Sequence, residues 1–281
     1  MIRGEGLEVH RSWPGKSSRC SLCGVNLSVA AGRVGLILGR SGAGKTTLLE
    51  TMAGLVASSP GTVRFSSAAG QWRWGLGELA PREARRRMGF LFQYPERQLF
   101  GATPLEDVEW GAMPRCDGAA ERALEAVGLP PQLWATSLRR LSRGEKRRVA
   151  LAGLLIREPE VLFLDEPAVG LDPEGQALLW QEVEAYRHGR GAAVLVATHW
   201  PEPWLRCAAN VLCLEAGVVL FSGPVVALPE AARRNRAIAA LLPVTWRLRL
   251  ELEGGGAPPG APPEWVAAAK RWLAARAWSA R

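Results

Sequence analysis

Eight residues near the start of the chain constrain its fold more than any other feature. Gly39-Arg-Ser-Gly-Ala-Gly-Lys-Thr46 satisfies the pattern G-x-x-x-x-G-K-[ST] and follows an apolar run, Val34–Leu38. The glycines let backbone N–H groups turn inward around phosphate oxygens, and a helix that begins here points its positive end at the same anion. The spacing predicts a strand, a phosphate-binding loop and a helix from Lys45 to about Ala53. The predicted nucleotide contacts are Gly39, Arg40, Ser41, Gly42, Ala43, Gly44, Lys45, Thr46 and Thr47.

A second apolar run ends in two carboxylates, Val161-Leu-Phe-Leu-Asp165-Glu166. Ligands of α/β proteins bind at the carboxyl ends of buried parallel strands. We expect Asp165 and the Thr46 hydroxyl to hold Mg²⁺, and Glu166 to orient and deprotonate an attacking water. Apolar runs before Asp-Glu are common, so a strand-ending turn is the alternative. The phosphate loop in the same chain favours the catalytic interpretation.

Short apolar runs alternate with helical segments along most of the chain. The pattern predicts strands at Thr62–Phe65, Met88–Phe92 and Ala192–Ala197, a hairpin of Val211–Leu214 with Val218–Phe221, a helix at Pro173–Tyr186 and a mostly helical stretch over 104–158. Residues 66–80 are expected to form a loop. This alternation indicates an α/β fold with a largely parallel sheet.

The C-terminal part of the chain has a different character. Residues 231–281 contain nine Arg or Lys and three Glu, most of the net charge of +8 that the 281 residues carry. Val244–Leu252 alternates apolar and polar residues, which predicts a half-exposed strand. Residues 254–263 read as a Gly/Pro linker, and 264–278 as an amphipathic helix. A basic tail suits nucleic acid, an anionic membrane surface, an acidic partner or plain solvation.

Composition and cysteine usage exclude several classes. Hydrophobic residues make up 48% of the chain, and no run reaches about 20 clean apolar residues, so we expect no transmembrane segment. The start of the chain has no apolar core of the kind a secretory signal needs. Cys20 and Cys23 form one C-x-x-C among five cysteines, without a second pair at zinc spacing. We expect a structural, buried role for this pair in a reducing cytosol, with a metal or redox role as the alternative.

With these motifs, the chain resembles the nucleotide-binding subunits of ABC transporters over roughly residues 5–225. Leu141-Ser-Arg-Gly-Glu-Lys-Arg-Arg148 is similar to the family's signature motif, and Gly170-Leu-Asp172 to its D-loop. Gln93 resembles the Q-loop glutamine, His199 the switch histidine, and Trp13 the aromatic residue that stacks on adenine. The order and spacing of these elements are more specific than any single motif.

A narrower resemblance points to the energy-coupling factor ATPases, which power uptake of vitamins, cobalt and nickel. It is carried by Phe92-Gln-Tyr-Pro-Glu-Arg-Gln-Leu-Phe100, Glu106-Asp-Val108, Lys146–Gly153 and Ala168–Pro173. The family fold implies a mostly parallel core sheet, an N-terminal antiparallel β subdomain and an inserted helical subdomain at about 95–158. The ATPase domain is then expected at 1–230, with a basic extension at 231–281.

The resemblance also implies roles and partners. ATP and Mg²⁺ are the expected cofactors, with Gln93 contributing to the Mg²⁺ site and to catalysis beside Glu166 and His199. Ser142, Gly144 and Asp172 are expected to contact ATP across a head-to-tail dimer. The expected partners are a second ABC ATPase, a transmembrane scaffold subunit and a substrate-binding membrane subunit, with no nucleic acid, at the cytoplasmic face of the cell membrane. The signature departs from L-S-G-G-Q at Arg143 and Glu145, which favours a heterodimer of unequal sites.

Each assignment has a plainer alternative. Trp13 is one of 12 tryptophans and competes with a core-packing role, and His199 alone fits a surface histidine at a strand end. We expect the basic run from Arg139 to Arg148 to lie near another subunit's ATP, and Arg85–Arg87 to form a solvated helix face. The competing functions are a soluble ABC ATPase acting on nucleic acid or ribosomes, and a regulatory module that binds ATP without hydrolysing it. For the tail, subunit pairing is the first hypothesis and membrane-surface binding the second.

Overall fold

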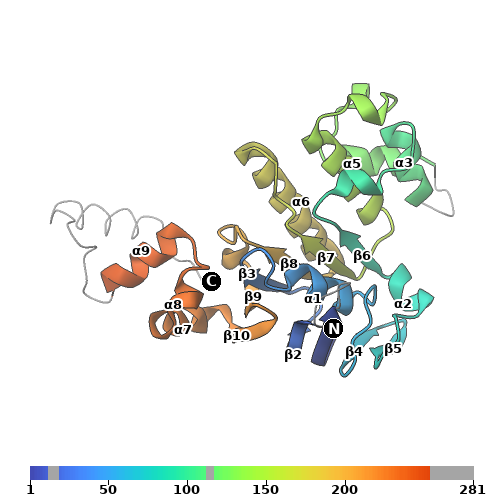
Figure 1. Ribbon diagram of the computed structural model, residues 1–281. Coiled ribbons are helices and arrows are strands. Elements are labelled where there is room, and N and C mark those ends of the chain that lie inside the picture. Colours follow the sequence, from blue (N-terminus) through green and yellow to red (C-terminus); the bar gives the residue numbers. More distant parts are fainter. Residues whose placement is uncertain (12–18, 112–116, 254–281) are drawn as a thin grey trace, which may run out of the picture.

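The computed structural model describes residues 1–11, 19–111 and 117–253. Two sheets form the body of the protein (Figure 1). An antiparallel sheet has the order β2-β1-β4-β5, from β1 (Ile2–Arg11), β2 (Arg19–Val29), β4 (Thr62–Ser67) and β5 (Gly70–Gly75). A six-stranded sheet has the order β10-β9-β3-β8-β7-β6, from β3 (Val34–Gly39), β6 (Met88–Leu91), β7 (Val161–Asp165), β8 (Ala193–Thr198), β9 (Ala208–Glu215) and β10 (Val218–Pro224).

The six-stranded sheet is parallel except for β10, which returns antiparallel to β9. Its central strands are buried on both faces, as expected of a sheet covered on two sides. Alternate residues of one strand therefore belong to different cores: Leu162 and Leu164 face one, Val161 and Phe163 the other. The parallel α/β core predicted from the sequence is confirmed.

The helices form two groups along the chain. The first group is α1 (Lys45–Met52), α2 (Arg82–Arg86), α3 (Pro104–Gly111), α4 (Ala119–Ala126), α5 (Arg143–Leu155) and α6 (Pro173–Arg190). The last group is α7 (Leu228–Arg234), α8 (Arg236–Ala239) and α9 (Val244–Glu253). Helices α3 and α5 stand away from the sheet at one end, while α7 to α9 gather at the other (Figure 1). None of the helices in the described ranges is long and apolar enough to cross a membrane.

The expected loop at 66–80 is wrong in its middle, where β5 forms a hairpin with β4. The alternation Gln71-Trp-Arg-Trp74 is the signal that was missed, because Gly70 and Gly75 made the segment resemble a turn. Trp74 is buried and its indole N–H donates to the backbone oxygen of Thr51 at 3.2 Å. The buried ring and its hydrogen bond anchor β5 to α1.

The strand predicted at Val244–Leu252 is also wrong, since this segment is helix α9. Trp246 and Leu250, four residues apart, pack against the core on one face of a helix. The alternation of Arg, Leu and Glu suits a helix as well as a strand, because these residues favour helices. The linker at 254–263 and the helix expected at 264–278 lie outside the described residues.

Candidate active site

The loop between β3 and α1 adopts a conformation that only glycine allows at two places. Gly44 has φ +104°, and a Cβ atom there would lie 2.6 Å from the backbone oxygen of Ser21. A Cβ atom on Gly39 would lie 2.7 Å from the backbone oxygen of Leu214. The loop therefore packs against neighbouring backbone without side chains in between, and its N–H groups precede the positive end of α1.

Lys45 lies at the first turn of α1 and is buried. Its ammonium donates to the backbone oxygen of Gly39 at 2.9 Å and lies 3.2 Å from Glu166 Oε1. A buried lysine ammonium beside a glycine-rich loop is positioned to bind an anionic ligand.

Thr46, in the first turn of α1, lies beside Asp165, the last residue of β7. The Thr46 hydroxyl donates to Asp165 Oδ2 at 2.8 Å, while among the described residues Asp165 Oδ1 is buried without a hydrogen-bond partner. Burial raises the pKa of Asp165, and the hydrogen bond from Thr46 opposes that rise. Hydroxyl and carboxylate oxygens are ligands that Mg²⁺ prefers, so the orphaned oxygen fits a metal site.

Glu166 follows β7 with an uncommon backbone conformation, φ +47°. Its N–H donates to the backbone oxygen of Ala197 at 2.8 Å. Its Oε2 atom lies 2.8 Å from His199 Nδ1 and accepts the His199 N–H at 3.1 Å. The carboxylate thus contacts both Lys45 and His199, which the sequence assigned to the same reaction.

A cavity of about 620 Å³ opens in front of these groups. Its wall consists of residues from six parts of the chain: Cys20, Ser21, Arg40–Thr47, Gln93, Glu166, His199, Ala216 and Gly217. Asp165 is connected to this wall through its hydrogen bond to Thr46. The structure therefore brings the phosphate loop, both carboxylates, Gln93 and His199 into one site.

Four other predicted nucleotide contacts, Gly39, Ser142, Gly144 and Asp172, do not line this cavity. Ser142 caps α5, where its Oγ accepts the Glu145 N–H at 3.2 Å and its own N–H donates to Glu145 Oε2 at 2.7 Å. Gly144 lies in the first turn of the same helix. Asp172 caps α6 by accepting the Gly175 N–H at 2.8 Å. Trp13 lies outside the described residues.

The sequence placed Arg147 with the basic residues near another subunit's ATP, and this is wrong for Arg147, whose side chain lies inside the chain. Its guanidinium is buried and donates to the backbone oxygens of Pro167 and Gln93, the latter at 3.0 Å. Burial lowers the pKa of Arg147. It connects α5 to the Gln93 segment and to the residues after Glu166, a role that only tertiary structure reveals.

The structure adds to two further assignments. Arg87 is not simply solvated, because it pairs with Glu160 at 2.6 Å and stacks over Trp72 at 5.6 Å. Cys20 and Cys23, for which the sequence predicted a structural, buried role, are half-buried and joined by a disulfide. Cys20 was also missed as a residue of the cavity wall, because nothing in C-x-x-C indicates its distance from the phosphate loop.

Comparison with known proteins agrees with this geometry. Residues 22–169, more than half of the chain, match the family model described as "ABC transporter". The energy-coupling factor transporter ATP-binding protein EcfA2 of Bacillus thuringiensis (strain Al Hakam) is 35% identical over 247 residues, covering 84% of this chain and 82% of its own. The EcfA2 protein of Lactococcus lactis subsp. lactis (strain IL1403) is 36% identical over 209 residues, covering 72% of each chain.

Solved structures give the same result. CbiO1 from Clostridium perfringens, part of the ABC transporter complex CbiONQ, has a TM-score of 0.67 at 28% identity, covering 91% of this chain and 96% of its own. The ATP-binding cassette MJ0796, a dimer bound to ADP and phosphate, has a TM-score of 0.70 at 25% identity, covering 80% of this chain and 99% of its own. The chain therefore belongs to the ABC transporter family, as an ATPase similar to the energy-coupling factor ATP-binding proteins.

Proposed function

We propose that this chain hydrolyses ATP to power a membrane importer of the energy-coupling factor type, for a vitamin or a transition-metal ion. The observation that carries the proposal is the convergence of Lys45, Glu166 and His199 on one cavity beside the phosphate loop. The relatives with similar sequences are ATP-binding proteins of such transporters. In this proposal, another subunit binds and recognises the transported solute.

Nucleotide binding redistributes the contacts of Lys45. In this structure, its ammonium contacts both Glu166 Oε1 and the backbone oxygen of Gly39. Phosphate oxygens that enter the loop offer it a stronger anionic partner, and the loop N–H groups bind the same oxygens. Exchange of that partner frees Glu166 to accept a proton from the attacking water, with His199 still hydrogen-bonded to its other oxygen.

Mg²⁺ fits beside Thr46 and Asp165, whose Oδ1 atom lacks a hydrogen-bond partner among the described residues. When bound, it neutralises charge on the β- and γ-phosphate oxygens. Gln93, in the wall of the same cavity, is the third proposed ligand. The chain's own part is to hold these oxygens in place, which the hydrogen bond between Thr46 and Asp165 already does.

A second subunit completes the site in this proposal. Ser142, Gly144 and Asp172 sit at the N-termini of α5 and α6, where the helix dipoles favour a negatively charged ligand. Glu145 replaces the usual glutamine of the motif and keeps Ser142 ordered through the capping box. Arg143 is exposed at the start of α5 and adds positive charge there. We propose a head-to-tail dimer with a second, different ABC ATPase.

The proposed docking face for the transmembrane scaffold lies beside the Gln93 segment. Tyr94 and Phe100 expose large aromatic surfaces in this segment, with Phe100 75% exposed. Arg147 connects the Gln93 backbone to α5, so movement of this face reaches the signature helix. We propose that residues 1–230, with a helical subdomain at 95–158, form the ATPase domain at the cytoplasmic face of the membrane, and that 231–281 form the extension.

Co-purification tests this assignment. The chain is co-expressed with its paralogous ATPase and the membrane scaffold, and the scaffold is captured from detergent. We expect the wild-type chain to be recovered with it and Phe100→Asp to be largely lost, with Val226→Asp, whose side chain is also largely exposed but lies near α7, as the control. Recovery of Phe100→Asp at the wild-type level, or recovery with ribosomes instead of membranes, contradicts the proposal.

A further inference from the structure

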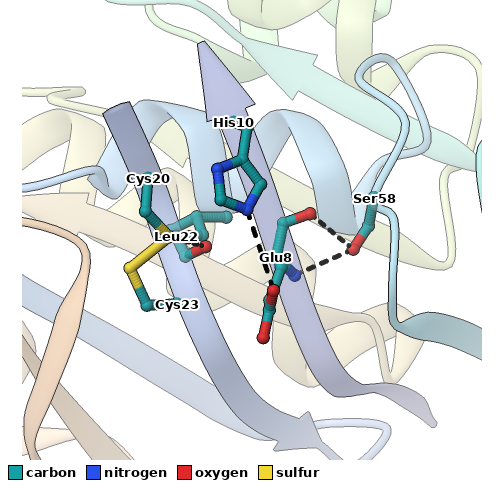
Figure 2. The surroundings of a disulfide bond; sticks show 6 residues. All are labelled: Glu8, His10, Cys20, Leu22, Cys23 and Ser58. Carbon is teal, nitrogen blue, oxygen red and sulfur yellow. Dashed lines mark hydrogen bonds and ion pairs between the residues drawn. A yellow bond between two sulfur atoms is a disulfide. The ribbon is translucent and has the colours of Figure 1, made fainter. Parts of the chain in front are cut away.

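Cys20, in the cavity wall, and its disulfide partner Cys23 have no part in the proposed hydrolysis. Cys20 and Cys23 form a disulfide within β2, with their Cα atoms 6.0 Å apart (Figure 2). Residues three apart in a regular strand face opposite sides of a sheet. Strand β2 carries an extra residue relative to β1 on each side of Leu22, because Leu7, Val9 and His10 pair with Val25, Leu22 and Cys20. These bulges bring the two sulfur atoms within bonding reach.

The bridged segment is in direct contact with the phosphate loop. Cys20 and Ser21 line the same cavity as residues 40–47. The Cys23 N–H donates to the Gly217 oxygen at 3.0 Å, and the Gly217 N–H donates to the Ala43 oxygen at 2.9 Å. Two successive hydrogen bonds therefore join the disulfide to the loop that precedes α1.

The other described cysteines are poor candidates for redox chemistry. Burial raises the pKa of the Cys207 and Cys213 thiols to about 12, so both remain protonated at neutral pH. Cys20 and Cys23 are half-buried, whereas Cys213 is fully buried. Cys20 Sγ lies 2.8 Å from the backbone oxygen of Leu22, an acceptor for the thiol once it is reduced (Figure 2).

We propose that Cys20 and Cys23 are a redox modification site that sets nucleotide affinity. A thiolate of a cellular dithiol reductant attacks one sulfur of the bridge and forms a mixed disulfide, and the reductant's second thiol displaces the cysteine. Two electrons and two protons pass to Cys20 and Cys23, and the reductant leaves as its own disulfide. Hydrogen peroxide reverses the change: one thiolate becomes a sulfenic acid, the second thiol displaces water, and the peroxide yields two waters.

The oxidised form is the tighter binder in this proposal. The cross-link fixes the backbone from Cys20 to Cys23, so the cavity wall is ordered before nucleotide arrives. Reduction restores freedom to that backbone, and binding must then order it at a cost in conformational entropy. The hydrogen bonds through Gly217 transmit the difference to Ala43 and the phosphate loop.

Calorimetric titration of the full chain with MgADP, which avoids turnover, tests the proposal. One sample is oxidised with hydrogen peroxide and one reduced with dithiothreitol, and peptide mass mapping measures the Cys20–Cys23 bond in each. We expect the oxidised protein to bind MgADP at least about threefold more tightly, and dithiothreitol to reverse this. The double variant Cys20→Ser/Cys23→Ser should bind like the reduced protein under both conditions, whereas Cys207→Ser should keep the response.

Equal MgADP affinity of the two wild-type forms overturns the proposal, and this comparison needs no variant to fold. The proposal also fails if mapping finds no Cys20–Cys23 bond after oxidation. An undiminished response in the double variant assigns the effect to other cysteines and has the same consequence. Hydrolysis through Glu166 is unaffected by any of these results, so the two claims fail separately.

Discussion

Glu166 combines a strained backbone with a crowded side chain. A non-glycine residue at φ +47° costs on the order of 1 kcal/mol, and the surrounding contacts must outweigh it. They do so through the hydrogen bond to Ala197 and the contacts of the carboxylate with Lys45 and His199. The strain places the carboxylate over the cavity, where an extended residue after β7 would direct it along the strand.

Glu182, on α6, gives the protein a pH-dependent stability. Burial raises its pKa in the folded state to about 7 from a usual 4.5, against the opposing charge of Arg148. Between these values the folded chain keeps a proton that the unfolded chain has released, so stability falls as pH rises from about 4.5 to 7 and then stays level.

Scanning calorimetry at pH 5 and pH 8 measures this effect. We expect the Tm of wild type, relative to Glu182→Gln, to be lower at pH 8 than at pH 5. Glu174→Gln, on the exposed part of the same helix, is the control. A Tm difference between wild type and Glu182→Gln that does not change with pH contradicts the assignment.

At the scale of elements, one buried arginine connects three of them. Arg147 joins α5 to the segment after β6 and to the segment after β7, by donating to the backbone oxygens of Gln93 and Pro167. Its removal leaves buried carbonyl groups unpaired. The signature helix is thereby held in register with Gln93.

Replacement of Arg147 tests this connection. Arg147→Ala should lower the free energy of unfolding by about 2–4 kcal/mol, because a charged donor to two buried carbonyls is lost. Arg143→Ala, exposed on the same helix, should change it by less than about 0.5 kcal/mol. Urea titration measures both, and equal effects of the two variants contradict the role assigned to Arg147.

Local sequence signals predicted those elements whose conformation depends on few neighbours. The strand and helix around the phosphate loop followed from glycine spacing, since positive φ at Gly44 needs no tertiary context. Val244–Leu252 could not be predicted, because its alternation suits two structures and packing of Trp246 and Leu250 decides between them. The roles of Arg147 and of the Cys20–Cys23 bridge depend on contacts between distant segments, which no spacing within the sequence encodes.

At the scale of the whole molecule, one copy supplies only half of the proposed site. The phosphate loop, Glu166 and His199 line the cavity, whereas Ser142, Gly144 and Asp172 lie on other elements and do not reach it. In the proposed head-to-tail pair, the second set of one subunit would lie over the nucleotide held by the other. Glu145 and Arg143 make this chain's signature unlike the usual one, which favours pairing with a different ATPase.

Co-expression with the paralogous ATPase tests that pairing. With different tags on the two chains, sequential affinity capture should recover a stable mixed pair in the presence of ATP. Recovery of homodimers alone excludes the heterodimer. It would leave two identical sites, each with the Arg143 of the opposite copy near its nucleotide.

The C-terminal extension is predicted to assist the pairing. Thr245 on α9 donates to Glu202 at 2.9 Å, which ties this helix to the loop that follows His199. Deletion of residues 244–281 should weaken dimers in analytical ultracentrifugation. Unchanged dimers, together with loss of binding to anionic vesicles, favour the membrane-surface role instead.

ATP turnover by the purified protein with Mg²⁺, for wild type beside Glu166→Gln, tests the central claim most directly. The variant keeps the size of the side chain and removes its basicity. We predict that wild type hydrolyses ATP and that Glu166→Gln is slower by at least about 10²-fold while still binding ATP. Hydrolysis by Glu166→Gln at the wild-type rate would contradict the account.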